Sequence, residues 1–298
     1  MLIKVQKMKK FIILESLFET NPKIGKKLYD EVLSLPNLQI DKKLIEYKEA
    51  DDGLAFIREM QQIANNDLNC EIMLHLVMHG NVKKDGLVTP KGELISWSLF
   101  ADLARNVNRS TKNNLFLTMA VCHGAYCMQE IKCWNAAPFK KTIGSFKPIY
   151  FANAVQCYEK FYKLVLTGTP ENQAVAAFHS ENEQWLRSNY EMLKKDGVTD
   201  FSEYRYALID CEEVFLKIAS KTAVEEESAM RARFDKLCPE FDLEGEMKEK
   251  IWEMFKVEAR KTYKYRMIEY AGTFFMTSQI PENMKYVETV KQLDWKLD

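Results

Sequence analysis

Two runs of almost uninterrupted apolar residues constrain the fold more than any other feature of this sequence. They are EIMLHLVMHG at 71–80 and LFLTMAVC at 115–122. A strand with one face in water alternates apolar and polar residues, whereas a strand covered on both faces is apolar throughout. Both runs are therefore predicted to be central strands of a buried sheet.

The segments around these runs alternate between strand-like and helix-like patterns, as βαβ units do. Further strand-like segments are FIILESLF at 11–18, LIEYKEA at 44–50 and KTIGSFKPIYFANA at 141–154. Helices are predicted from apolar spacing at 21–36, 53–66, 96–107 and 156–166, with a short helix after 122. The expected fold class is α/β, a mostly parallel sheet flanked by helices.

The alternation fades near residue 180. From about residue 201 the chain consists of long charged-plus-apolar segments such as EGEMKEKIWEMFKVEARKTYKYRMIEYAGTFF, which favour helix over strand. The sequence therefore predicts an α/β domain at 1–180 and an α-helical C-terminal extension at 181–298.

Charge and cysteine content exclude several functional classes. Lys and Arg total 42 against 43 Asp and Glu, so no overall field attracts nucleic acid or an anionic membrane. The apolar run at the start is interrupted by Glu15 and is read as the first strand rather than as a secretory signal. No apolar stretch approaches the roughly 20 residues of a membrane-spanning helix. Seven cysteines, an odd number without regular spacing, are typical of a reducing cytoplasm, so we expect a soluble cytoplasmic protein.

A polar tip ends each of the two apolar runs. His79 and Gly80 close the first, and Cys122, His123 and Gly124 close the second. The carboxyl ends of parallel strands meet at one edge, and the single helix predicted between the runs has the length of a crossover between neighbouring strands. Neighbouring strands lie about 4.8 Å apart, so the His79 imidazole can act as base for the Cys122 thiol. The backbone amides of Gly80 and Cys122 are then candidate donors to an oxyanion.

These strand ends carry a resemblance to a known group of enzymes. LHLVMHG followed by LFLTMAVCHGAYC resembles the His-Gly and Cys-x-Gly strand ends of caspase-like cysteine peptidases, the clan of caspases, metacaspases, separase, gingipain-like enzymes and bacterial CHAT proteases. The resemblance covers roughly residues 10–180. It implies a thiol protease with His79 as base, Cys122 as nucleophile, the amides of Gly80 and Cys122 as oxyanion hole, protein substrates, and neither cofactor nor metal.

The same resemblance suggests a substrate pocket and a biological setting. The pocket residues would be Ala120, Ser145 and Lys147. Relatives that cleave after Arg or Lys often carry an acidic residue where Ala120 stands, which argues against a basic P1 preference. The interval between Cys122 and Thr142 is short and shows no obvious processing linker, so activation by cleavage of the chain is not favoured. A prokaryotic caspase homologue of this kind implies triggered proteolysis in antiviral defence, with the C-terminal region binding an activating or inhibitory protein partner.

Other interpretations of the same residues stay open. The sheet could be an inactive scaffold that binds a protein partner, or the thiol could transfer acyl groups. Cys122, His123, Cys127 and Cys133 could form a zinc site, although a second spaced pair is missing. His75 is expected to be a hydrogen-bonded core histidine. The remaining cysteines are expected to be packing residues: Cys70, Cys157, Cys211 and Cys238.

Overall fold

The computed structural model describes residues 10–65, 70–237, 239 and 244–293, with the backbone alone described at 221–226 and 237. Two compact units divide this chain. The sheet unit runs up to residue 130 and continues over 138–210, and the helical unit combines 131–137 with the residues from 211 onward. The chain therefore passes from one unit to the other three times.

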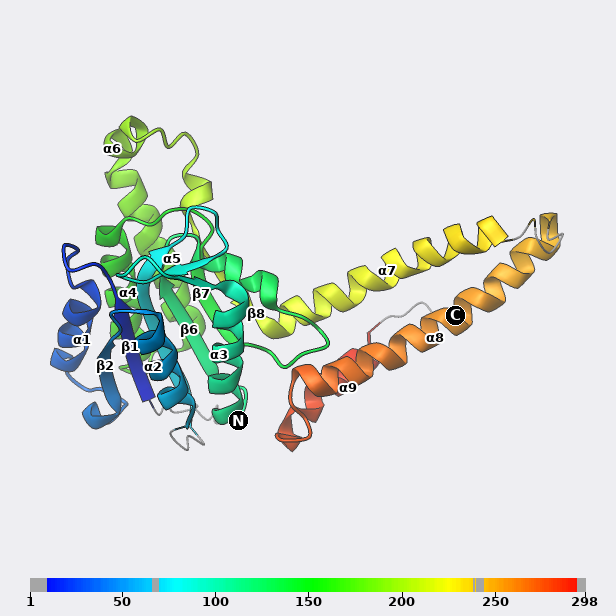
Figure 1. Ribbon diagram of the computed structural model, residues 1–298, viewed down its shortest axis with the longest axis horizontal. Helices are drawn as coiled ribbons and strands as arrows, with labels where there is room; N and C mark the ends of the chain where they lie inside the picture. Colours follow the sequence, from blue (N-terminus) through cyan, green and yellow to red (C-terminus); the bar gives the residue numbers. More distant parts are fainter. Residues whose placement is uncertain (1–9, 66–69, 238, 240–243, 294–298) are drawn as a thin grey trace. The chain divides into compact units, whose positions relative to one another are not determined.

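The sheet unit is built on a mixed sheet of eight strands in which parallel pairing dominates (Figure 1). Its main strands are β1 (Lys10–Ser16), β2 (Ile45–Glu49), β3 (Ile72–Gly80), β6 (Leu115–Ala120), β7 (Lys141–Ser145) and β8 (Tyr206–Asp210). They lie in the order β2-β1-β3-β6-β7-β8, and all neighbours are parallel except β8, which is antiparallel to β7. A hairpin of β4 (Gly86–Val88) and β5 (Leu94–Ser96) pairs with the end of β3.

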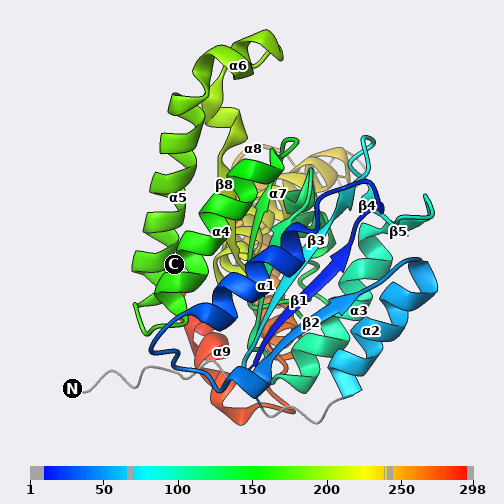
Figure 2. The ribbon, with the colours of Figure 1, turned by 90° about the vertical axis from the view of Figure 1, so that its left-hand side faces the viewer.

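Helices cover both faces of this sheet (Figure 2). One face carries α1 (Ile24–Ser34), α4 (Phe151–Val165) and α5 (Glu171–Ser188), and the other carries α2 (Gly53–Asn65) and α3 (Trp97–Ser110). The main core lies between the sheet and the first group, where β1, β3 and β6 pack against aromatic residues of α4. A smaller helix, α6 (Tyr190–Lys195), and 3-10 segments at Lys42–Leu44, Gly124–Glu130 and Phe201–Tyr204 complete the unit.

The two apolar runs form the central strands, as predicted. Every residue of β6 is buried, and so are the first seven residues of β3. The predicted α/β class, the mostly parallel sheet with flanking helices and the helical C-terminal region are thus present in the structure.

The segment 141–154 differs from its strand-like pattern. Only Lys141–Ser145 is a strand, and α4 already begins at Phe151. Pro148 cannot donate to a ladder, and Tyr150 takes an extended conformation as the residue that caps α4. The final four residues of the pattern therefore belong to a helix.

The sheet also reaches further along the chain than the sequence pattern indicates. Residue 180 lies within α5, and β8 adds an edge strand at 206–210, so the sheet unit ends at 210. A strand of five residues with mixed burial leaves only a faint periodic signal beside long helical segments.

The helical unit is dominated by two long helices. They are α7 (Cys211–Leu237) and α8 (Gly245–Phe274), followed by a 3-10 turn at Pro281–Asn283 and α9 (Met284–Lys291). Near the start of α7, Phe215 packs on Phe274 and Phe275 at ring distances of 4.8 and 5.3 Å. Along the helices, the Tyr263 hydroxyl donates to the Ala219 carbonyl at 3.0 Å.

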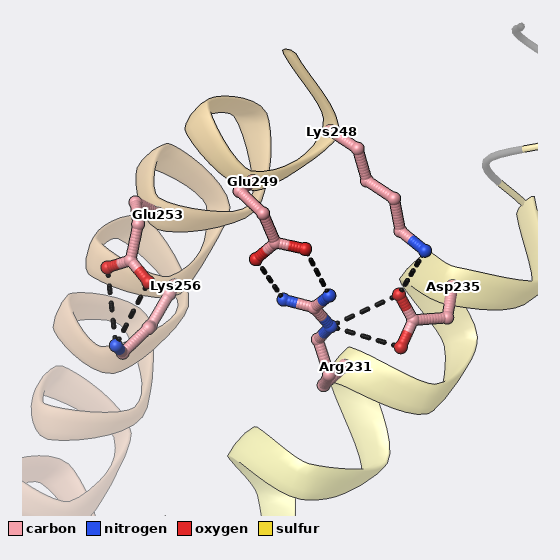
Figure 3. A network of polar contacts seen from close by, with 6 residues as sticks. All are labelled: Arg231, Asp235, Lys248, Glu249, Glu253 and Lys256. Atoms are coloured by element: carbon pink, nitrogen blue, oxygen red, sulfur yellow. Dashed lines mark hydrogen bonds and ion pairs between the residues drawn. The ribbon is translucent and has the colours of Figure 1, made fainter. Parts of the chain in front are cut away.

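Far from that aromatic contact, charged side chains join α7 to α8 (Figure 3). The Arg231 guanidinium donates to both oxygens of Glu249, at 2.9 and 2.7 Å, and to the Asp235 carboxylate, which also pairs with Lys248 at 2.8 Å. The same guanidinium lies 5.1 Å from the Trp252 ring. At this end, α7 and α8 are therefore joined by ion pairs and by the contact between the Arg231 guanidinium and the Trp252 ring.

The segment 131–137 belongs to the helical unit although both of its neighbours in sequence belong to the sheet unit. Its Ala137 amide donates to the Phe274 carbonyl at 3.1 Å, and Ala136 forms a small buried cluster with Met276 and Ile280. The chain thus leaves the sheet unit shortly after β6, contacts the end of α8, and returns to form β7.

In the part of the chain that the structure describes, no helix combines the length and apolar character needed to cross a lipid bilayer.

Candidate active site

Five parallel strands, β2, β1, β3, β6 and β7, bring their carboxyl ends to one edge of the sheet. Val77 of β3 and Ala120 of β6 form the last pair of their ladder, and beyond it the backbone of Gly80 lies close to that of Cys122. The His79 ring lies near Phe151, and the Cys122 sulfur accepts from the Ile149 amide, so both side chains reach the segment between β7 and α4. The structure therefore brings together the two residues that the sequence singled out for chemistry.

Gly80 allows this close approach. A Cβ atom at this position would lie 1.7 Å from the Cys122 carbonyl oxygen and 2.7 Å from its carbonyl carbon. Any side chain would thus push the ends of β3 and β6 apart. Glycine is therefore required at this position because the backbones of residues 80 and 122 lie so close together, whether or not the Gly80 amide has a role in catalysis.

The His79 imidazole is oriented by a residue that sequence reasoning missed. Its Nε2 atom lies 2.8 Å from Asn21 Oδ1. An amide oxygen can only accept, so Nε2 carries the proton and Nδ1 keeps the lone pair of a base. The rings of Phe18 and Phe151 flank the imidazole, with centroids at 4.9 and 5.9 Å. This burial lowers the pKa of His79 and favours the neutral ring at neutral pH.

The Cys122 thiol is half-buried, and its sulfur accepts a hydrogen bond from the backbone amide of Ile149 at 3.4 Å. Burial raises the pKa of the thiol, and the amides of Ile149 and of Cys122 itself oppose that rise. Within the described residues, no hydrogen bond joins the sulfur to His79. The two groups together are therefore a neutral thiol beside a neutral imidazole.

The chain makes a turn at His123, the residue directly after the proposed nucleophile Cys122. Its φ angle is 61°, in the left-handed region that costs a non-glycine residue about 1–2 kcal/mol. The conformation is held from both sides: the His123 amide donates to the Lys147 carbonyl at 3.2 Å, and its Nδ1 atom lies 2.9 Å from the Phe146 carbonyl oxygen. The imidazole of His123 is thus bound to the segment after β7.

The three residues predicted for a substrate pocket occupy different environments. Ala120 is 1% exposed within the main core, so only its backbone could face a substrate. Ser145 is also buried, and its hydroxyl accepts from the Lys147 amide at 3.1 Å. The Lys147 ammonium pairs with Glu203 at 2.6 Å. Their role in substrate binding stays a prediction.

His75 is a hydrogen-bonded core histidine, as predicted. It is 1% exposed, its Nδ1 lies 3.0 Å from Thr118 Oγ1, and that hydroxyl in turn contacts the Tyr162 hydroxyl at 2.5 Å. Burial lowers the pKa of His75 to about 3. The ring is therefore neutral and structural.

The other cysteines differ in burial. Cys157 and Cys211 are buried as expected for packing residues, Cys70 is partly exposed, and Cys238 lies outside the described residues. For the zinc alternative, burial raises the pKa of Cys133 to about 11 and that of Cys127 further. Across the described ranges, no group of three or more His, Cys, Asp or Glu side chains is placed to hold a metal ion.

Comparison with known proteins adds no assignment to this site. No protein-family model matches the chain, and no curated protein matches it.

Proposed function

We propose that the chain is a cysteine endopeptidase in which Cys122 is the nucleophile, His79 the base and Asn21 the residue that orients the base. The observation that carries this proposal is the pairing of strand ends in which Nε2 of His79 is bound by Asn21. That bond leaves Nδ1 as the atom that can accept a proton.

The chemistry follows from the neutral state of both groups. The Cys122 sulfur attacks the scissile carbonyl carbon while His79 takes the thiol proton, because the raised thiol pKa makes a permanent thiolate unfavourable. The protonated imidazole then gives its proton to the departing amine, which leaves an acyl group on the sulfur. Water, deprotonated by His79, releases the acyl group and restores the thiol.

The carbonyl oxygen gains negative charge during each attack and needs donors. The backbone amides of Gly80 and Cys122 are the proposed pair, because the two backbones lie so close that a Cβ atom at residue 80 would overlap the Cys122 carbonyl. No cofactor enters these steps. The caspase-like resemblance supports protein substrates, with Ala120, Ser145 and Lys147 beside P1.

The test is a comparison of new protein N-termini in cells that express the wild-type chain or Cys122→Ala. We expect cleavages that need Cys122 and share one residue before the cut. Identical sets of termini, from folded proteins in the presence of the neighbouring gene products, would contradict the proposal.

An inactive scaffold is the second candidate, favoured by the absence of a Cys122–His79 hydrogen bond among the described residues. A cysteine-directed acyloxymethyl ketone peptide separates the two. Labelling of Cys122 that is lost in His79→Ala supports the enzyme, whereas labelling equal to that of the other cysteines supports the scaffold.

The helical unit is the proposed site of control by a protein partner, in the setting of triggered defence. The support is the segment 131–137, which follows the 3-10 helix Gly124–Glu130 after the nucleophile and packs within the helical unit. Truncation tests this best when the chain ends after Asp210, because an earlier end removes β8. A truncated protein that folds and is regulated like the full chain would contradict it.

A further inference from the structure

The segment 146–150 connects β7 to α4 and supplies the hydrogen bond to the sulfur of Cys122. Ile149 donates that bond at 3.4 Å, and its side chain packs against the main core. The next residue, Tyr150, faces a different cluster. The side chains of Ile149 and Tyr150 therefore pack into two different clusters, and the Ile149 amide lies at the junction between them.

The second region is a satellite cluster at the far end of α5. Its buried residues are Leu186, Leu193 and Val198, and Tyr150, Trp185, Phe201 and Tyr204 pack against them. The Tyr150 ring lies 5.4 Å from Trp185 and 6.4 Å from Tyr204, and its hydroxyl donates to Asp196 at 3.2 Å. The ring is therefore fixed by three contacts from residues 185–204.

A charged contact fixes the other end of the segment to the same region. The Lys147 ammonium pairs with Glu203 at 2.6 Å, and the Lys147 carbonyl accepts from the His123 amide at 3.2 Å. Lys147 and Tyr150 thus bracket Ile149, and both are bound to residues 196–204. The position of the amide that reaches the sulfur depends on contacts made by a cluster outside the sheet.

We propose that Tyr150 and Trp185 are positioning residues for the nucleophile, which hold segment 146–150 so that the Ile149 amide donates to the Cys122 sulfur. Neither side chain needs to touch a substrate. The inference rests on the proposed function in taking Cys122 as the reactive group.

The test is the pH dependence of Cys122 alkylation by iodoacetamide, measured on the Cys122 peptide by mass spectrometry in the full chain. The reagent reacts with the thiolate and needs no substrate, so the result is independent of whether the chain cleaves proteins. In Tyr150→Ala and Trp185→Ala we expect the midpoint to move to higher pH. Alkylation at pH 7 should slow by about threefold to tenfold, since one pKa unit is a tenfold change in thiolate.

Two variants separate positioning from loss of structure. Tyr150→Phe keeps the ring in the cluster and should restore most of the wild-type profile, and Tyr265→Ala removes an exposed aromatic residue of α8 and should change nothing. Simple loosening would expose the sulfur and move the midpoint to lower pH. A midpoint that falls or stays unchanged in Trp185→Ala, with the circular dichroism of the wild type, would overturn the proposal.

Discussion

The sheet unit and the helical unit differ in what holds their residues in place. In the sheet unit, both central strands are covered on two faces, and polar groups such as Glu15 and His75 are buried with hydrogen-bond partners. In the helical unit, α7 and α8 leave large side chains such as Met254 and Phe255 more than half exposed, and charged networks cross between them. The first arrangement can hold reacting atoms in fixed positions, whereas the second leaves more apolar side-chain surface in contact with water.

The residues proposed to react lie in the unit whose central strands are buried on both faces. All four histidines and the nucleophile candidate lie in the sheet unit, whereas the helical unit supplies aromatic residues and charge pairs. We therefore expect substitutions in the sheet unit to change reactivity and acid stability, and those in the helical unit to change salt response.

The largest effect is expected for Cys122→Ala. It should lower kcat/KM for a cleaved peptide by about a thousandfold or more, because the substitution removes the thiol proposed to form the acyl intermediate. Stability to urea should change by less than about 1 kcal/mol, since the side chain is half-buried and small. Cys211→Ala, at a buried position in the helical unit, is the matched control and should keep full activity.

The second-largest effect is expected from acid, which should destabilise the sheet unit more than the helical unit. In the folded protein the pKa of His75 is about 3, below its usual 6.5. Between these two pH values, His75 is protonated in the unfolded chain but stays neutral in the folded protein. The sheet unit should lose stability as pH falls from 6.5 towards 3, by on the order of a few kcal/mol. Hydrogen exchange measured peptide by peptide follows each unit separately.

His75→Leu is the control for this acid effect. It removes the titrating ring while Thr118 keeps its contact with Tyr162. The loss of protection in β3 and β6 should then begin at lower pH. Equal acid sensitivity in both units of the wild type would contradict the comparison.

A smaller effect is expected for Asn21→Ala. Loss of the acceptor frees the His79 ring and should lower kcat/KM by about tenfold to a hundredfold, part of what general-base catalysis contributes. In Asn21→Asp the added carboxylate favours the protonated ring, so the acid limb of the pH–rate profile should move to higher pH. A profile identical in wild type, Ala and Asp variants would remove Asn21 from the site.

The smallest effect is expected for Arg231→Met in the helical unit. The variant keeps an apolar stem near Trp252 but loses the ion pairs to Glu249 and Asp235 (Figure 3). Amide exchange in α7 and α8 should rise slightly at low salt and match the wild type near about 1 M salt, where screening removes such pairs. An equally small change in β3 would show that the two units are not energetically distinct.

Sequence patterns predicted the features that depend on local periodicity. The runs that became β3 and β6, the tips at His79 and Cys122, and the core role of His75 can all be read from apolar spacing and strand-end position. Asn21 was missed, although the Asn-Pro turn after the first strand lies at the same sheet edge as the other tips. Asn21 could have been found from its position, because each loop that follows a parallel strand begins at the sheet edge where His79 and Cys122 lie.

Other features depend on contacts between residues far apart in sequence. The return of 131–137 to the end of α8 rests on Ala137 meeting Phe274, for which no periodic pattern exists. The edge strand β8 depends on pairing with β7 across 60 intervening residues. The strand-like pattern at 141–154 failed because Pro148 breaks it in the middle.

The excursion of the chain through 131–137 also determines how the protein should respond to a single cut. A nick between residues 210 and 211 breaks one covalent link between the units, yet Ala136 and Ala137 remain bound to Met276, Ile280 and Phe274. The longer fragment, which contains the sheet unit, therefore keeps seven of its residues packed within the shorter helical fragment. Limited proteolysis at this point should yield two bands on a denaturing gel and a single species by gel filtration.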